Sequence, residues 1–300
     1  MASTSNWSLT AHLLSTYSDE YVKATQHPFL LAAAEGRLPK EVLGRWLAND
    51  RLYIHSYIKA AGKLLASIDL PQTVPMPSPK TAESGGETIE TQLLDWLIEA
   101  LAAVRKEERL FIEVAERYGL SMDWDCGPIG TTAQIASRVV SSEAKVPGLV
   151  MMEHLFAGIV DITTDSSASL GVAAAVRTPP TLLPWLEGAI IFWGTERCYL
   201  DAWSWAKSKQ PLAHTLAADD TRYQDADGGA LRREFIPNWS SPAFAQFVGR
   251  LGGLIDFAVS QELEDSAKAE TRKKEILERI EGKWKSLLIA EATFWPEIPA

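Results

Sequence analysis

The stretch WLANDRLYIHSY (residues 46–57) sets an acidic residue on an aromatic helical face. Asp50 shares this face with three aromatic residues, Trp46, Tyr53 and Tyr57, at offsets of four, three and seven. Such offsets place side chains on one side of an α-helix. Carboxylates are rarely buried without a partner, because moving an ionised group out of water is costly. The stretch therefore predicts a helix that turns a carboxyl group toward an internal pocket.

Two later stretches repeat this arrangement. In WGTERCYLDAW (residues 193–203), Glu196 shares a face with the two terminal tryptophans. In WKSLLIAEATFW (residues 284–295), Glu291 follows a leucine pair and precedes a Phe-Trp pair. We expect the three acids to meet in one water-poor cavity, where they would serve binding or proton transfer.

Helical periodicity dominates the chain, and no run of alternating residues predicts a strand. Proline and serine starts and glycine stops support several of the helix boundaries. The sequence therefore predicts an all-α single domain of seven to nine helices over residues 1–300, with a proline-rich loop insertion at about 69–88. The predicted helices cover residues 9–25, 40–68, 88–118, 131–141, 147–162, 167–175, 183–209, 241–264 and 266–295.

Composition excludes several classes of protein. The chain has 300 residues, 46% of them hydrophobic, and a formal net charge of −10, which disfavours binding to nucleic acid or an anionic membrane. No apolar run is long enough for a transmembrane span, and the polar start argues against a secretory signal. The two cysteines define no disulfide framework. We expect a cytoplasmic protein that binds a neutral or cationic small molecule.

The familiar catalytic motifs are absent from the sequence. No glycine-rich phosphate loop follows a predicted strand, and no G-x-S-x-G element occurs. Helical di-iron sites use Glu-x-x-His pairs, whereas no histidine here has Asp or Glu three or four residues before it. A metal-dependent oxygenase is disfavoured, although ligands from separate helices would escape this test.

Short motifs follow one another in a recognisable order. His27-Pro28-Phe29 is followed by Gly36 and Leu38, and then by Trp46-Leu47-x-x-Asp50-x-x-Tyr53. Near the end, Asn238-Trp239-Ser240-Ser241-Pro242-x-Phe244 precedes a final Glu291-x-x-Phe294-Trp295. In order and spacing these motifs resemble the TenA / thiaminase II family. The resemblance extends over about residues 20–70 and 185–260 and includes the last helix.

The resemblance implies a heme-oxygenase-like helical bundle and hydrolysis at an aminomethyl-pyrimidine. One branch of that family uses a Cys nucleophile, and the helix around Glu196 resembles a second branch that carries Glu there. Cys198 is only two residues away and remains the rival for this position. Periodicity favours Glu196, because two helical residues rotate a side chain by about 200°. Trp239 replaces a tyrosine of the family.

The resemblance also implies roles for individual residues. Asp50 and Tyr53 would hold a 4-aminopyrimidine ring, through paired hydrogen bonds and stacking. Glu196 would position water or the leaving amine, and Tyr199 could extend its hydrogen bonds. Glu291 would be the general acid/base, because its apolar neighbours should raise its pKa. We expect an aminopyrimidine hydrolase of the thiamin-salvage type that needs no metal or organic cofactor and forms a homo-oligomer.

Simpler readings stand beside these roles. Asp50 could be a surface acid paired with Arg45 or Lys40, Glu196 could pair with Arg250, and Glu291 could reach solvent as the last helix frays. The tyrosines and Trp239 could be ordinary core. Two other functions also stay open: a non-catalytic pyrimidine-binding protein, or an oxidase or oxygenase on the same fold.

Overall fold

The computed structural model describes residues 7–73, 87–124, 140–159, 182–211, 224–264 and 267–298. Over these ranges the chain is largely helical and contains no strand, so the predicted all-α fold is confirmed. No helix in the described ranges is long and apolar enough to cross a membrane. The helix predicted at 167–175, nearly all of the one at 131–141 and most of the proline-rich insertion lie outside them.

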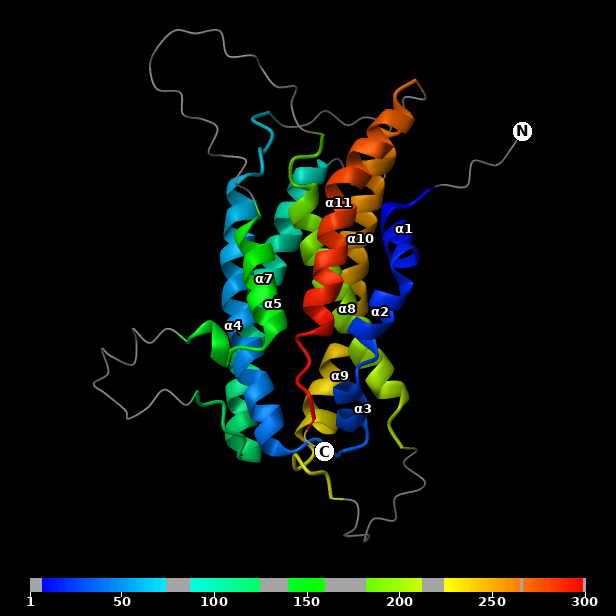
Figure 1. Ribbon diagram of the computed structural model, residues 1–300. Coiled ribbons are helices and arrows are strands. Elements are labelled where there is room, and N and C mark those ends of the chain that lie inside the picture. Colours follow the sequence, from blue (N-terminus) through cyan, green and yellow to red (C-terminus); the bar gives the residue numbers. More distant parts are fainter. Residues whose placement is uncertain are drawn as a thin grey trace.

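The long helices stand side by side and form the body of the bundle (Figure 1). Helices α4 and α5 are antiparallel, since Lys40 Nζ at the start of α4 donates a 2.6 Å hydrogen bond to the Tyr118 carbonyl at the end of α5. Helix α7 packs on both α4 and α11. The long helices and α7 are α4 (Lys40–Ala66), α5 (Ile89–Tyr118), α7 (Pro147–Ala157), α8 (Leu186–Ser208), α10 (Pro242–Glu262) and α11 (Ala269–Ala292).

Three short helices at the start of the chain pack against the long ones: α1 (Leu9–Thr16) on α10, α2 (Ser18–Thr25) on α8 and α11, and α3 (Pro28–Ala34) on α8. The single helix predicted for residues 9–25 is wrong, because Tyr17 leaves helical backbone geometry and separates α1 from α2. His27 begins α3, and its Nδ1 accepts a hydrogen bond from the Phe29 amide at 3.2 Å. The imidazole thus satisfies an orphan donor of the first turn, which is a structural use of this histidine.

Other predicted boundaries hold in part. Ser241 caps α10 as expected, accepting from the Phe244 amide at 3.2 Å. Helix α7 ends at Ala157, five residues before the predicted end, and a short turn η1 (Ser142–Ala144) precedes it. Between the helices predicted at 183–209 and 241–264, where no helix was predicted, η5 (Leu231–Phe235) is π-helical and runs into α9 (Ile236–Trp239).

Two glycines allow the last helix to approach its neighbours. A Cβ at Gly194 of α8 would lie 2.9 Å from the Trp284 ring of α11. A Cβ at Gly148 of α7 would lie 2.3 Å from the Phe294 amide nitrogen, and the Gly148 amide donates to the Thr293 carbonyl at 3.1 Å. A side chain at either place would force its neighbours to shift, so glycine permits both close approaches. These approaches bring Glu291 and Glu196 toward the same interior.

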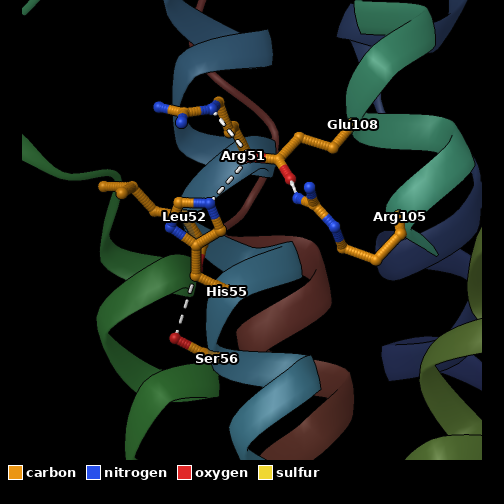
Figure 2. Close-up of polar contacts among 6 residues, drawn as sticks. All are labelled: Arg51, Leu52, His55, Ser56, Arg105 and Glu108. Carbon is orange, nitrogen blue, oxygen red and sulfur yellow. Dashed lines mark hydrogen bonds and ion pairs between the residues drawn. The ribbon is translucent and has the colours of Figure 1, made fainter. Parts of the chain in front are cut away.

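Three partly exposed side chains surround one buried carboxylate and join α4 to α5 (Figure 2). Glu108 is only 4% exposed and accepts hydrogen bonds from Arg51 Nε at 2.9 Å and His55 Nε2 at 2.8 Å. Arg105, one turn earlier on α5, binds its other carboxylate oxygen. A buried charge needs such partners, so this cluster fixes the position of α5 against α4.

Candidate functional site

All six residues selected from the sequence line one cavity of about 740 Å³. Their side chains come from helices α4, α8, α9 and α11, which lie far apart in the sequence. The structure therefore brings together the three acids, two tyrosines and one tryptophan, while their roles remain predictions. The six are Asp50, Tyr53, Glu196, Tyr199, Trp239 and Glu291.

Asp50 is fixed at the buried end of this cavity. Asp50 is only 3% exposed, and its Oδ2 accepts a 2.9 Å hydrogen bond from the Tyr199 hydroxyl. Burial raises the pKa of Asp50 well above its usual range, and the neighbouring Glu107 adds to the rise. Neither Arg45 nor Lys40 pairs with it: Lys40 binds a backbone carbonyl instead. The surface ion pair considered for Asp50 is therefore wrong.

Glu196 faces the cavity from α8. Its Oε1 accepts a 2.8 Å hydrogen bond from the Tyr57 hydroxyl of α4. Burial raises the pKa of Glu196 to about 8, with a further contribution from Glu107. Arg250 pairs instead with Glu99 at 2.5 Å, so the alternative Glu196–Arg250 pair is wrong.

Cys198, the rival for the position of Glu196, is 1% exposed and is not among the residues that line the cavity. Burial raises the pKa of the Cys198 thiol well above its usual range, and Glu291 adds to the rise. A thiol in this environment is a weak nucleophile, because the thiolate is the reactive form. Geometry thus favours Glu196 over Cys198 for contact with a bound ligand.

Glu291 is buried at the end of α11. The residue is 5% exposed, and no described residue donates a hydrogen bond to its carboxyl group. Burial raises the pKa of Glu291 well above its usual range, and Asp50 and Glu196 add to the rise. The helix end is anchored, since Trp295 Nε1 donates to the Ala24 carbonyl at 2.7 Å. The fraying considered for this terminus is therefore wrong.

The sequence interpretation missed a fourth carboxyl group. Glu107 of α5 lines the cavity and accepts a hydrogen bond from the Trp239 indole. Burial raises the pKa of Glu107 to about 7, and the bond from Trp239 opposes this rise. A signal was present, because Glu107 stands three residues after Val104 and four before Phe111, both of them buried on α5.

Aromatic rings support the acids. The Tyr53 ring lies 5.5 Å from that of Phe156 and 5.9 Å from that of Phe294, measured between centroids. Thr195, another lining residue, is 2% exposed and donates its hydroxyl to the Phe192 carbonyl at 3.0 Å. Fixed rings beside carboxyl groups suit a flat ligand that carries basic nitrogens.

The four acids that line the cavity all have raised pKa values. Since the pKa of each is raised, their carboxyl groups keep their protons to a higher pH than exposed acids do, and a protonated carboxyl group can both donate and accept hydrogen bonds. They interact electrostatically, so ionising one disfavours ionising the next. Among the residues that the structure describes, no group of three or more His, Cys, Asp or Glu could hold a metal ion.

Comparisons with known proteins agree with this fold. Residues 14–74 match the model of the TENA/THI-4/PQQC family. A protein of Fusarium pseudograminearum named a probable transcription factor is 28% identical over 267 residues. That match covers 88% of this chain but 48% of the relative, so the chain spans about half the length of the curated relative.

Solved structures of TenA proteins share the helical arrangement. A TenA homologue from Pyrococcus furiosus gives a TM-score of 0.53 at 17% identity and covers 95% of this chain and 99% of its own. A TenA family transcription regulator from a Silicibacter species gives 0.56 at 11% identity, with 95% and 94% covered. At these identities the likeness concerns the fold. The predicted TenA-type helical bundle is confirmed, whereas the assignment to the branch with Glu is not tested.

Proposed function

We propose that this protein is an aminopyrimidine hydrolase that acts on thiamin-related breakdown products. The proposal starts from its TenA-like N-terminal sequence and its TenA-like fold. The acidic cavity would bind the pyrimidine, and its carboxyl groups would transfer the protons of the reaction. In this proposal the chain needs neither a metal nor an organic cofactor. The protein acts on a free small molecule rather than on nucleic acid or membrane, works in the cytoplasm and forms a homo-oligomer.

Ring recognition falls to Asp50. Its Oδ1 receives no hydrogen bond from the described residues, while Oδ2 is held by Tyr199. A carboxyl group in this state matches the amino group and adjacent ring nitrogen of a 4-aminopyrimidine, one as donor and the other as acceptor. The Tyr53 ring would pack against the bound pyrimidine.

Bond cleavage falls to the other acids. Glu291 would give its proton to the leaving amine as the bond from the methylene carbon to nitrogen breaks. Glu196 would take a proton from the attacking water, whose oxygen bonds to the same carbon. The products are a hydroxymethyl-pyrimidine and ammonia, and proton exchange restores the two acids. A pKa near working pH suits both tasks.

The observation that carries this proposal is the state of Glu291. Glu291 is almost fully buried, faces a ligand-sized cavity and receives no hydrogen bond from the described residues. A buried acid in this state destabilises the fold. Such a group is retained where a ligand supplies the missing partner. Burial raises the pKa of Glu291, and its two acidic neighbours in the cavity add to the rise, which favours the protonated state that a general acid requires.

Turnover of 4-amino-5-aminomethyl-2-methylpyrimidine and its N-formyl derivative tests the proposal. We expect ammonia from the first compound, in amounts exceeding the enzyme. From the second we expect formate and the aminomethyl-pyrimidine, because water attacks the formyl carbon there and the formyl carbon–nitrogen bond breaks. Asp50→Asn should weaken binding of both compounds, because the amide cannot reproduce both protonation states of the carboxyl group. If neither compound yields product and neither binds, the proposal is wrong.

A second candidate is a pyrimidine-binding protein without turnover. It is favoured by the names of two relatives, a probable transcription factor and a transcription regulator. Glu196 in the nucleophile's region also fits a site that binds but does not react. Micromolar affinity for aminopyrimidine with no product after long incubation would establish this candidate over the hydrolase.

A further inference from the structure

The cavity extends well beyond its acidic end. The acids Asp50 and Glu291 mark the buried end, whereas exposed residues of α5 and α10 mark the mouth. Pockets of about 300–1,000 Å³ hold drug-sized ligands, and this one measures about 740 Å³. A single substituted pyrimidine ring would fill only part of it. The remaining space lies toward the mouth.

The wall toward the mouth is largely apolar, with the Glu107 carboxyl group as its polar member on α5. Apolar side chains of α5 and α10 form it: Ala103, Val104, Leu110, Ala243, Phe244 and Phe247. The Phe247 ring is stacked on Trp96 at 4.6 Å between centroids, and Trp96 Nε1 donates to the Phe247 carbonyl at 3.1 Å. These contacts hold the Phe247 ring in place, so this part of the wall is preformed before any ligand arrives.

The charged residues at the mouth give no strong preference for either sign. Glu99 is paired with Arg250 at 2.5 Å, and Glu234 with Arg117 at 2.9 Å. The other charged lining residues at the mouth are all exposed: Lys106, Arg109 and Glu113. Exposed charges interact weakly in water. The wall therefore favours an uncharged apolar group over an ionic one.

We propose that this apolar wall (residues 103, 104, 110, 243, 244 and 247) is a second subsite that binds an uncharged apolar group carried by the aminomethyl nitrogen of the substrate. The inference rests on the proposed function and names the substrate class: aminopyrimidine amides whose acyl group is larger than formyl. Hydrolysis adds water across the acyl carbon–nitrogen bond and releases a carboxylic acid and the aminomethyl-pyrimidine. The acidic end would hold the same ring in every member of the class.

A series of N-acyl aminopyrimidines tests the subsite, from formyl through butanoyl to hexanoyl. Dissociation constants are measured by calorimetry on the full chain. Burying one methylene stabilises by about 0.8 kcal/mol, which corresponds to about fourfold in affinity. We expect the dissociation constant to fall by about two- to fourfold per methylene, because the wall covers one side of the acyl chain and leaves the other toward the mouth.

Matched variants locate the effect. Ala103→Phe fills the subsite, while Ala102→Phe places the same ring on an exposed neighbouring position of α5 that does not line the cavity. The first variant should weaken hexanoyl binding by at least about tenfold, or roughly 1.4 kcal/mol, and leave formyl binding within about twofold. The second should change neither. Equal unfolding midpoints by circular dichroism establish that both variants fold.

The outcomes separate the two proposals. Equal affinity for formyl and hexanoyl compounds would overturn the subsite, while turnover of the formyl compound would still uphold the hydrolase. A rising affinity without turnover would support the subsite and contradict hydrolysis. Binding of no member of the series would overturn both. A loss of hexanoyl affinity in Ala102→Phe equal to that in Ala103→Phe would also overturn the subsite.

Discussion

The hydroxyl of Tyr199 on α8 donates a 2.9 Å hydrogen bond to Oδ2 of Asp50 on α4. This bond joins two helices across the cavity and orients the carboxyl group that is proposed to hold the pyrimidine. The bond also stabilises the ionised form of Asp50. It therefore lowers the pKa of Asp50, whereas burial raises it. Position and proton affinity of the acid therefore depend on one phenol.

Tyr199→Phe should weaken aminopyrimidine binding by about 1–3 kcal/mol, the range for a buried hydrogen bond whose partner is left unsatisfied. The pKa of Asp50 should rise further, so the affinity should change its dependence on pH. Calorimetric titration at several pH values measures both effects. Tyr21→Phe is the matched control, because Tyr21 donates a similar 2.6 Å bond to Asp201 and does not line the cavity. Equal losses of affinity in the two variants would contradict a binding role for the Tyr199–Asp50 pair.

Glu107 and Glu108 are adjacent on α5, yet removing each charge should have a different effect. Glu108→Gln should lower the free energy of unfolding by about 1.5–3 kcal/mol, because the charged hydrogen bonds to Arg51, His55 and Arg105 are lost. Glu107→Gln should not lower the free energy of unfolding at neutral pH, because it removes a carboxyl group whose ionisation burial makes costly, and it should weaken the binding of a basic ligand. Urea unfolding and ligand titration of both variants measure the contrast. If Glu107→Gln is the more destabilising of the two at neutral pH, this assignment is wrong.

Stability should fall as the pH rises from 4.5 toward 8. Burial raises the pKa of Glu107 to about 7 and that of Glu196 to about 8, so the folded chain binds more protons than the unfolded chain over this window. The free energy of unfolding then decreases with pH, and the stabilisation is lost once the pH passes the folded values. Glu196→Gln should flatten this slope. Denaturant unfolding at intervals across the window measures it, and an unchanged slope in the variant would contradict the raised pKa.

Cys198→Ala should retain hydrolysis within about threefold of the wild type, since the thiol lies outside the cavity lining and its raised pKa keeps it protonated. Steady-state turnover of the formyl compound measures this. Iodoacetamide should likewise leave activity intact. A loss of a hundredfold or more with unchanged folding would return Cys198 to the nucleophile's position.

Helical spacing predicted the acids of α4, α8 and α11, because each shares a helical face with apolar residues. Helical spacing could not show which of Glu107 and Glu108 faces the cavity, since both occupy a charged run and both are near the apolar positions of α5. Their roles depend on residues supplied by other helices: Trp239 for Glu107, and Arg51 with His55 for Glu108. Such partners lie far apart in the sequence.

Helix existence was more predictable than helix ends. Long amphipathic helices such as α4 and α10 were predicted to within a few residues, because proline and serine starts mark them. The break at Tyr17 lacks a glycine or proline and arises from packing of α1 and α2 on different neighbours, α10 and α11. The apolar extent of the cavity likewise follows from how α5 and α10 pack, which no local pattern encodes.

Single-turnover hydrolysis of 4-amino-5-aminomethyl-2-methylpyrimidine by the wild type and by Glu291→Gln tests the central claim most directly. The account predicts measurable ammonia release by the wild type and a loss of about 10²–10⁴-fold in the variant, the usual contribution of a positioned general acid. Ligand affinity should change far less. Full activity in Glu291→Gln would contradict the claim that this buried acid carries the reaction.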